Sequence, residues 1–191
     1  FAQADLLELR AMRRSFDVVE CSVVLHHMAD HFAGWRALLS LLRPGGFMLV
    51  GLYSEAARRG IVEARRFIAQ RGYGTSADDI RRCRQDLLAL DQSRELGTAF
   101  GDFFGVSSCR DLLFHVQEQR MRLSTIAPFL HDYGLTFLGF EIDNATLQAY
   151  RRCFPGDPGA TNLSQWETFE NENPDTFSGM YRFWIQKSDV S

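Results

Sequence analysis

The residues best suited to acid–base chemistry are two adjacent histidines, His26 and His27, and a third, His115, much further along the chain. A neutral imidazole can accept a proton near neutral pH, because its reference pKa is about 6.5. We therefore regard His26 and His27 as candidates for a catalytic base. His115 and Tyr53 are candidates for substrate contact, on a predicted helix and at the end of a predicted strand. For each of the four, the alternative is a packed or hydrogen-bonded structural side chain.

The cysteines and lysines argue against other kinds of site. The four cysteines are scattered, with no Cys-x-x-Cys pair and no cysteine–histidine cluster at zinc spacing, so we predict no metal site. We expect reduced thiols that pack as small hydrophobic side chains in a cytoplasmic protein. Lys187 is the only lysine and lies near the end of the sequence, which argues against a lysine Schiff base.

The composition indicates one globular domain, at most with an appended subdomain. The chain has 191 residues, of which 46% are hydrophobic and 24% charged, and its formal net charge is -3. It is long enough to bury a core without disulfides or metals. The near balance of 21 basic and 24 acidic residues argues against a dedicated nucleic-acid-binding protein. The apolar runs fall far short of the roughly 20 residues of a membrane span, and we see no secretory signal.

Strand and helix patterns alternate near the beginning of the chain. Residues 16–22 form an apolar, β-branched run that predicts a strand covered on both faces. Residues 32–42 carry apolar side chains at three- and four-residue spacing, which predicts an amphipathic helix that ends at Pro44-Gly45-Gly46. The apolar run 47–53 predicts a second strand. This order predicts a βαβ unit with parallel strands.

The middle of the chain has a helical pattern. From Glu55 to about Leu96 it is rich in arginine, with a break at residues 72–76, and we predict a helical insertion. Its arginines are expected to form a solvated face, with an anion-binding patch as the alternative. Further helices are predicted over 110–119 and 124–133. The last part predicts strands over 135–142 and 180–186, with helices at 145–154 and 163–171 between them.

Several of these segments resemble class I S-adenosylmethionine (SAM)-dependent methyltransferases. The segments are Asp5-Leu6, FDVVECSVVLHHM (16–28), LLRPGGFMLVGLYS (41–54), LTFLGFEI (135–142) and MYRFWIQ (180–186). The resemblance implies an α/β, Rossmann-like sheet with its later strands only, a helical insertion and a C-terminal antiparallel β-hairpin. It implies three parts: half of the SAM-binding core at 1–54, a helical insertion or lid at 55–134, and closing strands at 135–191. The implied activity is methyl transfer from SAM to a small-molecule or protein acceptor.

The resemblance also implies roles for individual residues. Asp5 matches the aspartate that contacts the adenine amino group, and Leu6 would pack beside the ring. Cys21, Ser22 and Val23, which close the first predicted strand, would line the methionine end of the cofactor. The following Leu25-His26-His27 segment would border the cofactor and the substrate entrance. Ligands of open parallel sheets bind at the carboxyl ends of the strands, which agrees with this placement.

The sequence departs from the family in two respects, and two alternative functions stay open. It has neither the glycine-rich loop after the first strand of the family nor the acidic residue that holds the ribose. We therefore expect a fragment that the upstream part of the same polypeptide completes, and possible self-association through an exposed sheet edge. The first alternative is a catalytically degenerate interaction module, whose arginine-rich insertion and acidic tail bind partners. The second is another Rossmann-like enzyme, such as a dehydrogenase.

Overall fold

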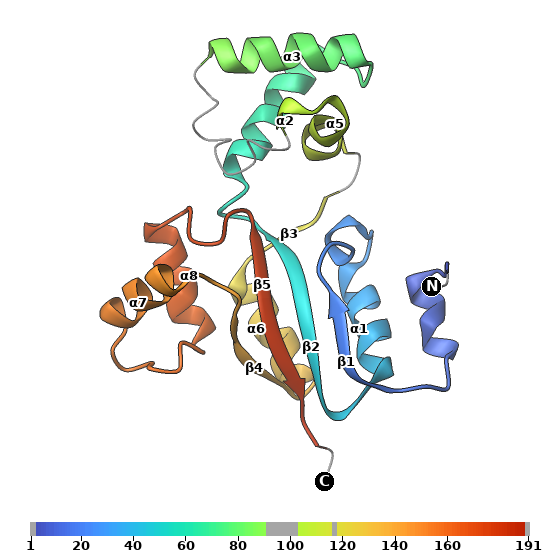
Figure 1. Cartoon of the computed structure of the whole chain (residues 1–191), viewed down its shortest axis with the longest axis vertical. Helices are drawn as coiled ribbons and strands as arrows, with labels where there is room; N and C mark the ends of the chain where they lie inside the picture. Colours follow the sequence, from blue (N-terminus) through green and yellow to red (C-terminus); the bar gives the residue numbers. More distant parts are fainter. Residues whose placement is uncertain (1–2, 91–102, 116–117, 190–191) are drawn as a thin grey trace.

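A mixed sheet with helices against it forms the larger part of the molecule, and a separate group of helices lies beyond one end of the sheet (Figure 1). The computed structural model describes residues 3–90, 103–115 and 118–189. Here η marks a 3₁₀ helix. The elements in chain order are η1 (Leu6–Ala11), β1 (Phe16–Cys21), η2 (Leu25–His27), α1 (His31–Leu41), β2 (Leu42–Ser54), α2 (Arg59–Arg71), α3 (Ala77–Ala89), α5 (Val106–Phe114), β3 (Arg120–Met121), α6 (Leu123–Asp132), β4 (Leu135–Phe140), α7 (Asn144–Cys153), α8 (Leu163–Glu172) and β5 (Met180–Lys187).

The sheet combines a parallel and an antiparallel part. Its strand order is β1-β2-β5-β4, and the short β3 pairs with the end of β2. β1 and β2 are parallel and joined by α1, which confirms the predicted βαβ unit. β2 pairs with β5 and β5 with β4 in the antiparallel sense. The predicted antiparallel pair of closing strands is therefore present, with α7 and α8 in the connection between them.

β1 differs from the prediction of a strand covered on both faces. Val18 is 54% exposed and Phe16 is 41% exposed. β1 is an edge strand of the sheet and pairs only with β2 among the described residues. One of its edges and much of its surface therefore face solvent. The apolar run indicates the strand correctly, but it does not reveal how many neighbours the strand has.

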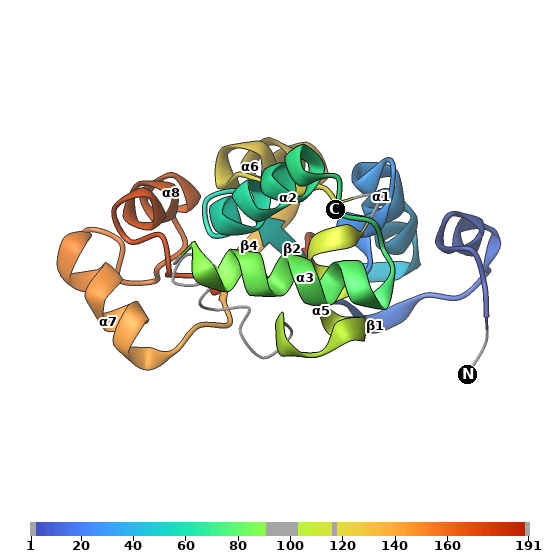
Figure 2. The ribbon, with the colours of Figure 1, turned by 90° about the horizontal axis from the view of Figure 1, so that it is seen from above.

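One hydrophobic core lies between the sheet and the helices α1 and α6, which lie on the same side of it (Figure 2). Trp35 of α1 is fully buried and stacks on Phe129 of α6 with ring centroids 4.4 Å apart. α1 begins where the side chain of Asp30 accepts a hydrogen bond from the Ala33 amide at 2.8 Å, an N-cap that satisfies a free helix donor. Trp35 also meets Phe183 of β5 with ring centroids 6.1 Å apart, so α1 is held against both α6 and the sheet.

The helical section has a core of its own. Its buried apolar residues come from α2, α3, α5 and Phe103, from Ile61 to Leu113. The predicted break at 72–76 is confirmed: Gly72 ends α2 with a φ of +69°, which favours glycine, and Ser76 caps α3. α5 begins and ends earlier than the predicted helix at 110–119. Part of the predicted insertion, 91–102, lies outside the described residues.

The predicted end of the insertion at residue 134 lies too far along the chain. α6 falls inside the range 55–134, yet its apolar residues Ile126, Phe129 and Leu130 belong to the core of the sheet. The helical section with its own core ends with α5, and the chain returns to the sheet through β3. Among the described residues, no helix has the length and the apolar character that crossing a membrane requires.

Candidate functional site

The candidate site lies where β1 and β2 end, below the helical section (Figure 1). The turn after β1 passes directly over β2, and Gly51 makes this approach possible. A Cβ atom at Gly51 would lie 2.1 Å from the carbonyl oxygen of Ser22, a distance that no side chain tolerates. The turn then continues into η2, which carries His26 and His27. The close fit of backbone on backbone positions both histidines at the carboxyl end of the parallel strands.

Cys21, Ser22 and Val23 have different environments in this turn. Cys21 is buried, and burial raises the pKa of its thiol to about 11, so the thiol is protonated at neutral pH and is a packing group. The Ser22 hydroxyl donates a hydrogen bond to a carboxylate oxygen of Glu20 at 2.9 Å. Val23 is 64% exposed. The turn therefore presents Ser22 and Val23 to the outside and turns Cys21 inward.

Asp5 and Leu6 lie at the beginning of η1. A carboxylate oxygen of Asp5 accepts a hydrogen bond from the Leu7 amide at 2.8 Å, which makes Asp5 the N-cap of η1. The side chain is exposed, and a carboxylate has room for further donors. Leu6 is partly buried against the core of the sheet. An exposed hydrogen-bond acceptor thus stands beside a partly buried apolar side chain.

His26 is a buried member of an aromatic stack. The residue is 1% exposed. Its ring stacks on that of Tyr53, with the ring centroids 3.7 Å apart and the ring planes at 28°. Neither ring nitrogen has a hydrogen-bond partner among the described residues, and the Gly51 backbone approaches the ring without completing hydrogen-bond geometry. Burial, aided by the charge of His27, lowers the pKa of His26 to about 4. His26 is neutral at physiological pH and closed to solvent.

His27 lines a cavity of about 470 Å³ together with residues of β2 and α5. The rings of His27 and His115 lie 4.3 Å apart, and His27 meets Tyr53 edge to face at 6.0 Å. The lining residues are His27, Tyr53, Ser108, Asp111, Leu112 and His115. The structure thus brings together His27, Tyr53 and His115, which the sequence analysis proposed as separate candidates. His26 does not line the cavity and is buried. We call this the histidine cavity.

Ser108, Asp111 and Leu112 were not among the predicted site residues. All three lie on α5, which His115 directly follows. The signal in the sequence is that Asp111 and Leu112 come one helical turn before His115. Apolar spacing alone marks such residues as an ordinary helix face, and only the tertiary structure shows that they share a cavity with Tyr53 at the end of β2.

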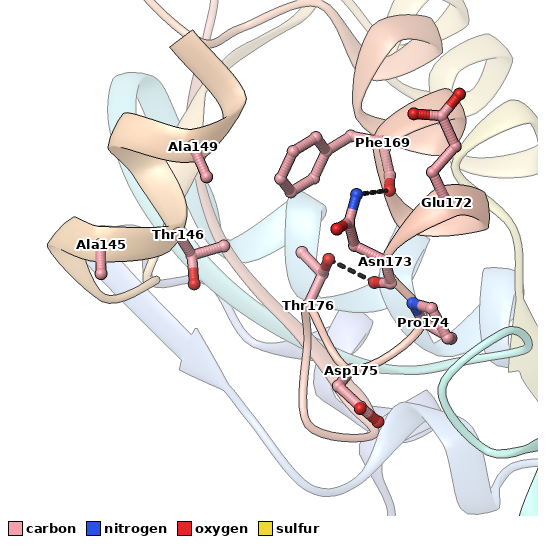
Figure 3. A pocket seen from close by; sticks show the side chains of 9 residues that line it. All are labelled: Ala145, Thr146, Ala149, Phe169, Glu172, Asn173, Pro174, Asp175 and Thr176. Carbon is pink, nitrogen blue, oxygen red and sulfur yellow. Dashed lines mark hydrogen bonds between the residues drawn. The ribbon is translucent and has the colours of Figure 1, made fainter. Parts of the chain in front are cut away.

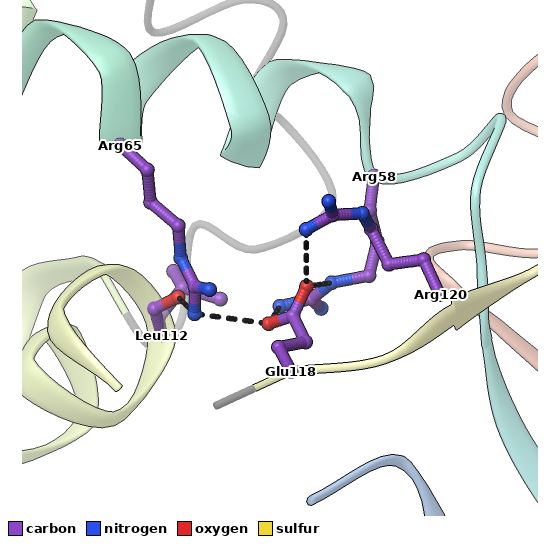
Figure 4. Close-up of polar contacts among 5 residues, drawn as sticks. All are labelled: Arg58, Arg65, Leu112, Glu118 and Arg120. Carbon is purple, nitrogen blue, oxygen red and sulfur yellow. Dashed lines mark hydrogen bonds and ion pairs between the residues drawn. The ribbon is translucent and has the colours of Figure 1, made fainter. Parts of the chain in front are cut away.

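A buried ion cluster lies next to the histidine cavity (Figure 4). The Glu118 carboxylate accepts two hydrogen bonds from the Arg58 guanidinium, at 3.0 and 2.8 Å, and one from Arg65 at 3.0 Å. Arg120 approaches the same carboxylate at 3.4 Å. These arginines hold the pKa of Glu118 below its ordinary value although burial opposes them. Arg58 also lies over the Tyr53 ring, 3.7 Å from the centroid, so the cluster supports one wall of the histidine cavity.

A second connection ties this cluster to the turn after β1. The Gln119 amide donates a hydrogen bond to the His26 carbonyl at 2.7 Å. The segment that leads from α5 into β3 is therefore attached at two points of the site. Glu118 attaches it to Arg58, which follows β2, and Gln119 attaches it to η2, which follows β1. The sequence did not predict this cluster.

A further cavity of about 550 Å³ lies between α7 and the end of α8 (Figure 3). Its lining includes Phe169, Asn173 and Thr176, and none of the predicted site residues. Two of its polar groups are engaged locally, because the Asn173 amide and the Thr176 hydroxyl donate hydrogen bonds to backbone carbonyls. The lining also includes the exposed acids Glu172 and Asp175, but no histidine.

Comparisons with known proteins agree with the fold. Residues 1–50 match a family described as "Methyltransferase domain". The chain is 30% identical over 149 residues to an uncharacterized protein of Synechococcus sp., a match that covers 74% of this chain and 36% of that protein. The chain thus spans about a third of the length of this curated relative.

Two solved structures have the same fold. PKMT2 from Rickettsia typhi matches with a TM-score of 0.71 at 10% identity, over 98% of this chain and 38% of that chain. PKMT2 from Rickettsia typhi in complex with AdoHcy matches with a TM-score of 0.70 at 11% identity, over 97% and 39% respectively. These matches confirm the predicted Rossmann-like α/β fold, and with the family match they confirm the resemblance to class I methyltransferases.

Proposed function

We propose that the protein containing this chain transfers a methyl group from SAM to a small-molecule or protein acceptor, and that the histidine cavity holds the acceptor. One observation carries the proposal: His27, Tyr53 and His115 come from three separate parts of the chain and line one cavity. This cavity adjoins the carboxyl ends of β1 and β2, where open parallel sheets bind their ligands. The family match and the fold, which also occurs in a protein solved with AdoHcy, support the choice of cofactor.

The cofactor would lie along the turn after β1. We assign the adenine contact to Asp5, whose exposed carboxylate can accept a hydrogen bond from an exocyclic amine, with Leu6 beside the ring. Cys21, Ser22 and Val23 would line the methionine end. In this assignment the buried Cys21 shapes the turn, and the exposed atoms of Ser22 and Val23 make the contact.

Methyl transfer requires that the protein align the acceptor with the methyl group and, for many acceptors, that it supply a base. Bound SAM supplies a methyl group on a positively charged sulfur, and many acceptors lose a proton as they are methylated. We assign proton acceptance to His27, because its imidazole lines the cavity. His26 is buried and a weaker base, so we assign it to positioning, as the stack that holds Tyr53. His115 and Tyr53 would contact the acceptor.

Calorimetric titration of S-adenosylhomocysteine (AdoHcy) into the intact protein tests this function. We expect saturable binding that Asp5→Ala weakens about tenfold or more, because a charge-assisted hydrogen bond contributes roughly 1.5–3 kcal/mol. Glu8→Ala is the matched control, since Glu8 is an exposed acid on the same short helix with no assigned contact. Absence of binding by a folded protein would contradict the proposal and favour the interaction module.

A further inference from the structure

We propose that a second cavity, which lies between the N-terminal part of α2 and the segment that leads into β3, binds an anionic phosphate or carboxylate group. We call it the arginine cavity. Its volume is about 420 Å³, and it is lined by Glu55, Arg59, Val62, Glu63, Arg66, Glu118, Gln119 and Arg120. The cavity shares Glu118 and Arg120 with the buried ion cluster.

The first argument is the charge of the buried cluster. Three guanidinium groups, those of Arg58, Arg65 and Arg120, surround the single carboxylate of Glu118, whose side chain is 1% exposed. Guanidinium stays protonated in proteins, so one carboxylate leaves an excess of positive charge, on side chains that are 8% (Arg58), 20% (Arg65) and 30% (Arg120) exposed. The Nε of Arg65 is also buried and has no hydrogen-bond partner in the described part of the chain. Uncompensated buried charge is costly, and an anion in the adjoining cavity would reduce that cost.

The second argument is the rest of the lining. Arg59 and Arg66 lie at the cavity on α2 and add positive charge to that of Arg120. Of the acids in the lining, Glu118 is already paired, and Glu55 is held by Arg122 at 2.9 Å. The lining holds three arginines and three glutamates, the third being Glu63, so its own formal charges balance. The positive excess comes from Arg58 and Arg65, which pair with Glu118 from outside the lining. Arginine presents a planar fork of donors that suits the oxygen atoms of phosphate and carboxylate.

The third argument is the position of the cavity relative to the histidine cavity. Arg58 binds Glu118, which lines the arginine cavity (Figure 4). The same guanidinium lies over the ring of Tyr53, which lines the histidine cavity. Arg58 lines neither cavity, but it contacts one lining residue of each and so connects the two. We infer that the anionic group belongs to the methyl acceptor. This assignment to the acceptor rests on the proposed function, whereas the anion site does not.

Titration of the intact protein with inorganic phosphate and, separately, with citrate tests the site at constant ionic strength and without any nucleoside ligand. We expect saturable binding of at least one probe, weakened about tenfold or more by the double substitution Arg59→Ala and Arg66→Ala. Both side chains are exposed and outside the buried cluster, so the fold should be kept, which circular dichroism verifies. Preference for phosphate or for citrate identifies the anionic group.

The matched control is Arg81→Ala with Arg82→Ala on α3, which removes the same charge from exposed positions outside the cavity lining. This control should change affinity by less than about twofold, because charges beyond a Debye length are screened. Equal weakening in both double variants would overturn the proposal, as would no saturable binding of either probe. AdoHcy titration of the same samples separates the two claims: AdoHcy binding without anion binding refutes only this inference, and the reverse refutes only the proposed function.

Discussion

Acidification should destabilise the chain through His26. The folded state holds this imidazole neutral, because burial lowers its pKa from 6.5 to about 4. Between these two values the unfolded chain binds a proton that the folded chain does not. Stability is therefore complete above the unfolded pKa and is lost as the pH falls toward the folded pKa.

The size of the effect follows from the shift in pKa. Each unit of pKa corresponds to about 1.4 kcal/mol, so the full shift of His26 corresponds to roughly 3 kcal/mol. Integrated over pH, the loss from this one group reaches about 2 kcal/mol by about pH 5 and about 3 kcal/mol by about pH 4. Such a loss is a large fraction of the stability of a typical domain.

Denaturant unfolding at a series of pH values measures this loss, with His26→Phe as the variant. Phenylalanine keeps an aromatic ring against Tyr53 and removes the titrating group. The difference in free energy of unfolding between the wild type and the variant should change by about 2 kcal/mol from pH 7 to pH 5. Other groups with a shifted pKa, such as His31, cancel in this difference because both proteins contain them.

A parallel pH dependence of the wild type and His26→Phe would refute the reasoning. It would mean that His26 is solvated or hydrogen-bonded in the folded protein, and that the stack on Tyr53 does not exclude water. A smaller but clear difference would indicate a smaller shift in pKa and would leave its direction intact.

Two further predictions concern the walls of the site. Glu118→Gln should lower the free energy of unfolding by about 3–5 kcal/mol in denaturant titrations, because it leaves Arg58 and Arg65 without their counter-charge. Glu63→Gln, at an exposed position in the arginine cavity that Glu118 also lines, should lower it by less than about 0.5 kcal/mol. Equal losses of stability in the two variants would contradict this reasoning. Gly51→Ala should separate β2 from the turn after β1 and abolish AdoHcy binding in calorimetry, whereas Gly156→Ala, whose added methyl would meet no atom within 4 Å, should bind normally.

The elements that apolar periodicity defines could be predicted from the sequence. The βαβ unit of β1, α1 and β2 and the late strands β4 and β5 follow from short apolar runs separated by helical spacing and glycine turns. The same signal predicted α6 as a helix, but an apolar helix face does not say which core the helix joins. It failed for the burial of β1 for a similar reason, since burial depends on neighbours that local sequence does not specify.

The site could be predicted only in part. His27, Tyr53 and His115 were nominated one by one from residue type and position, and their meeting in one cavity is a property of the tertiary structure. The difference between His26 and His27 could not be predicted, because adjacent residues on a 3₁₀ turn point in different directions and only packing decides which one is buried. The Glu118 cluster was missed because a buried glutamate among many arginines has the same local pattern as a solvated helix face.

A crystal structure of the intact protein grown with AdoHcy tests the central claim most directly. The account predicts the adenine beside Asp5 and Leu6, the amino acid end along Cys21–Val23, and the sulfur facing the histidine cavity. AdoHcy bound at another place, or no AdoHcy in a well-ordered protein grown at saturating concentration, would contradict it.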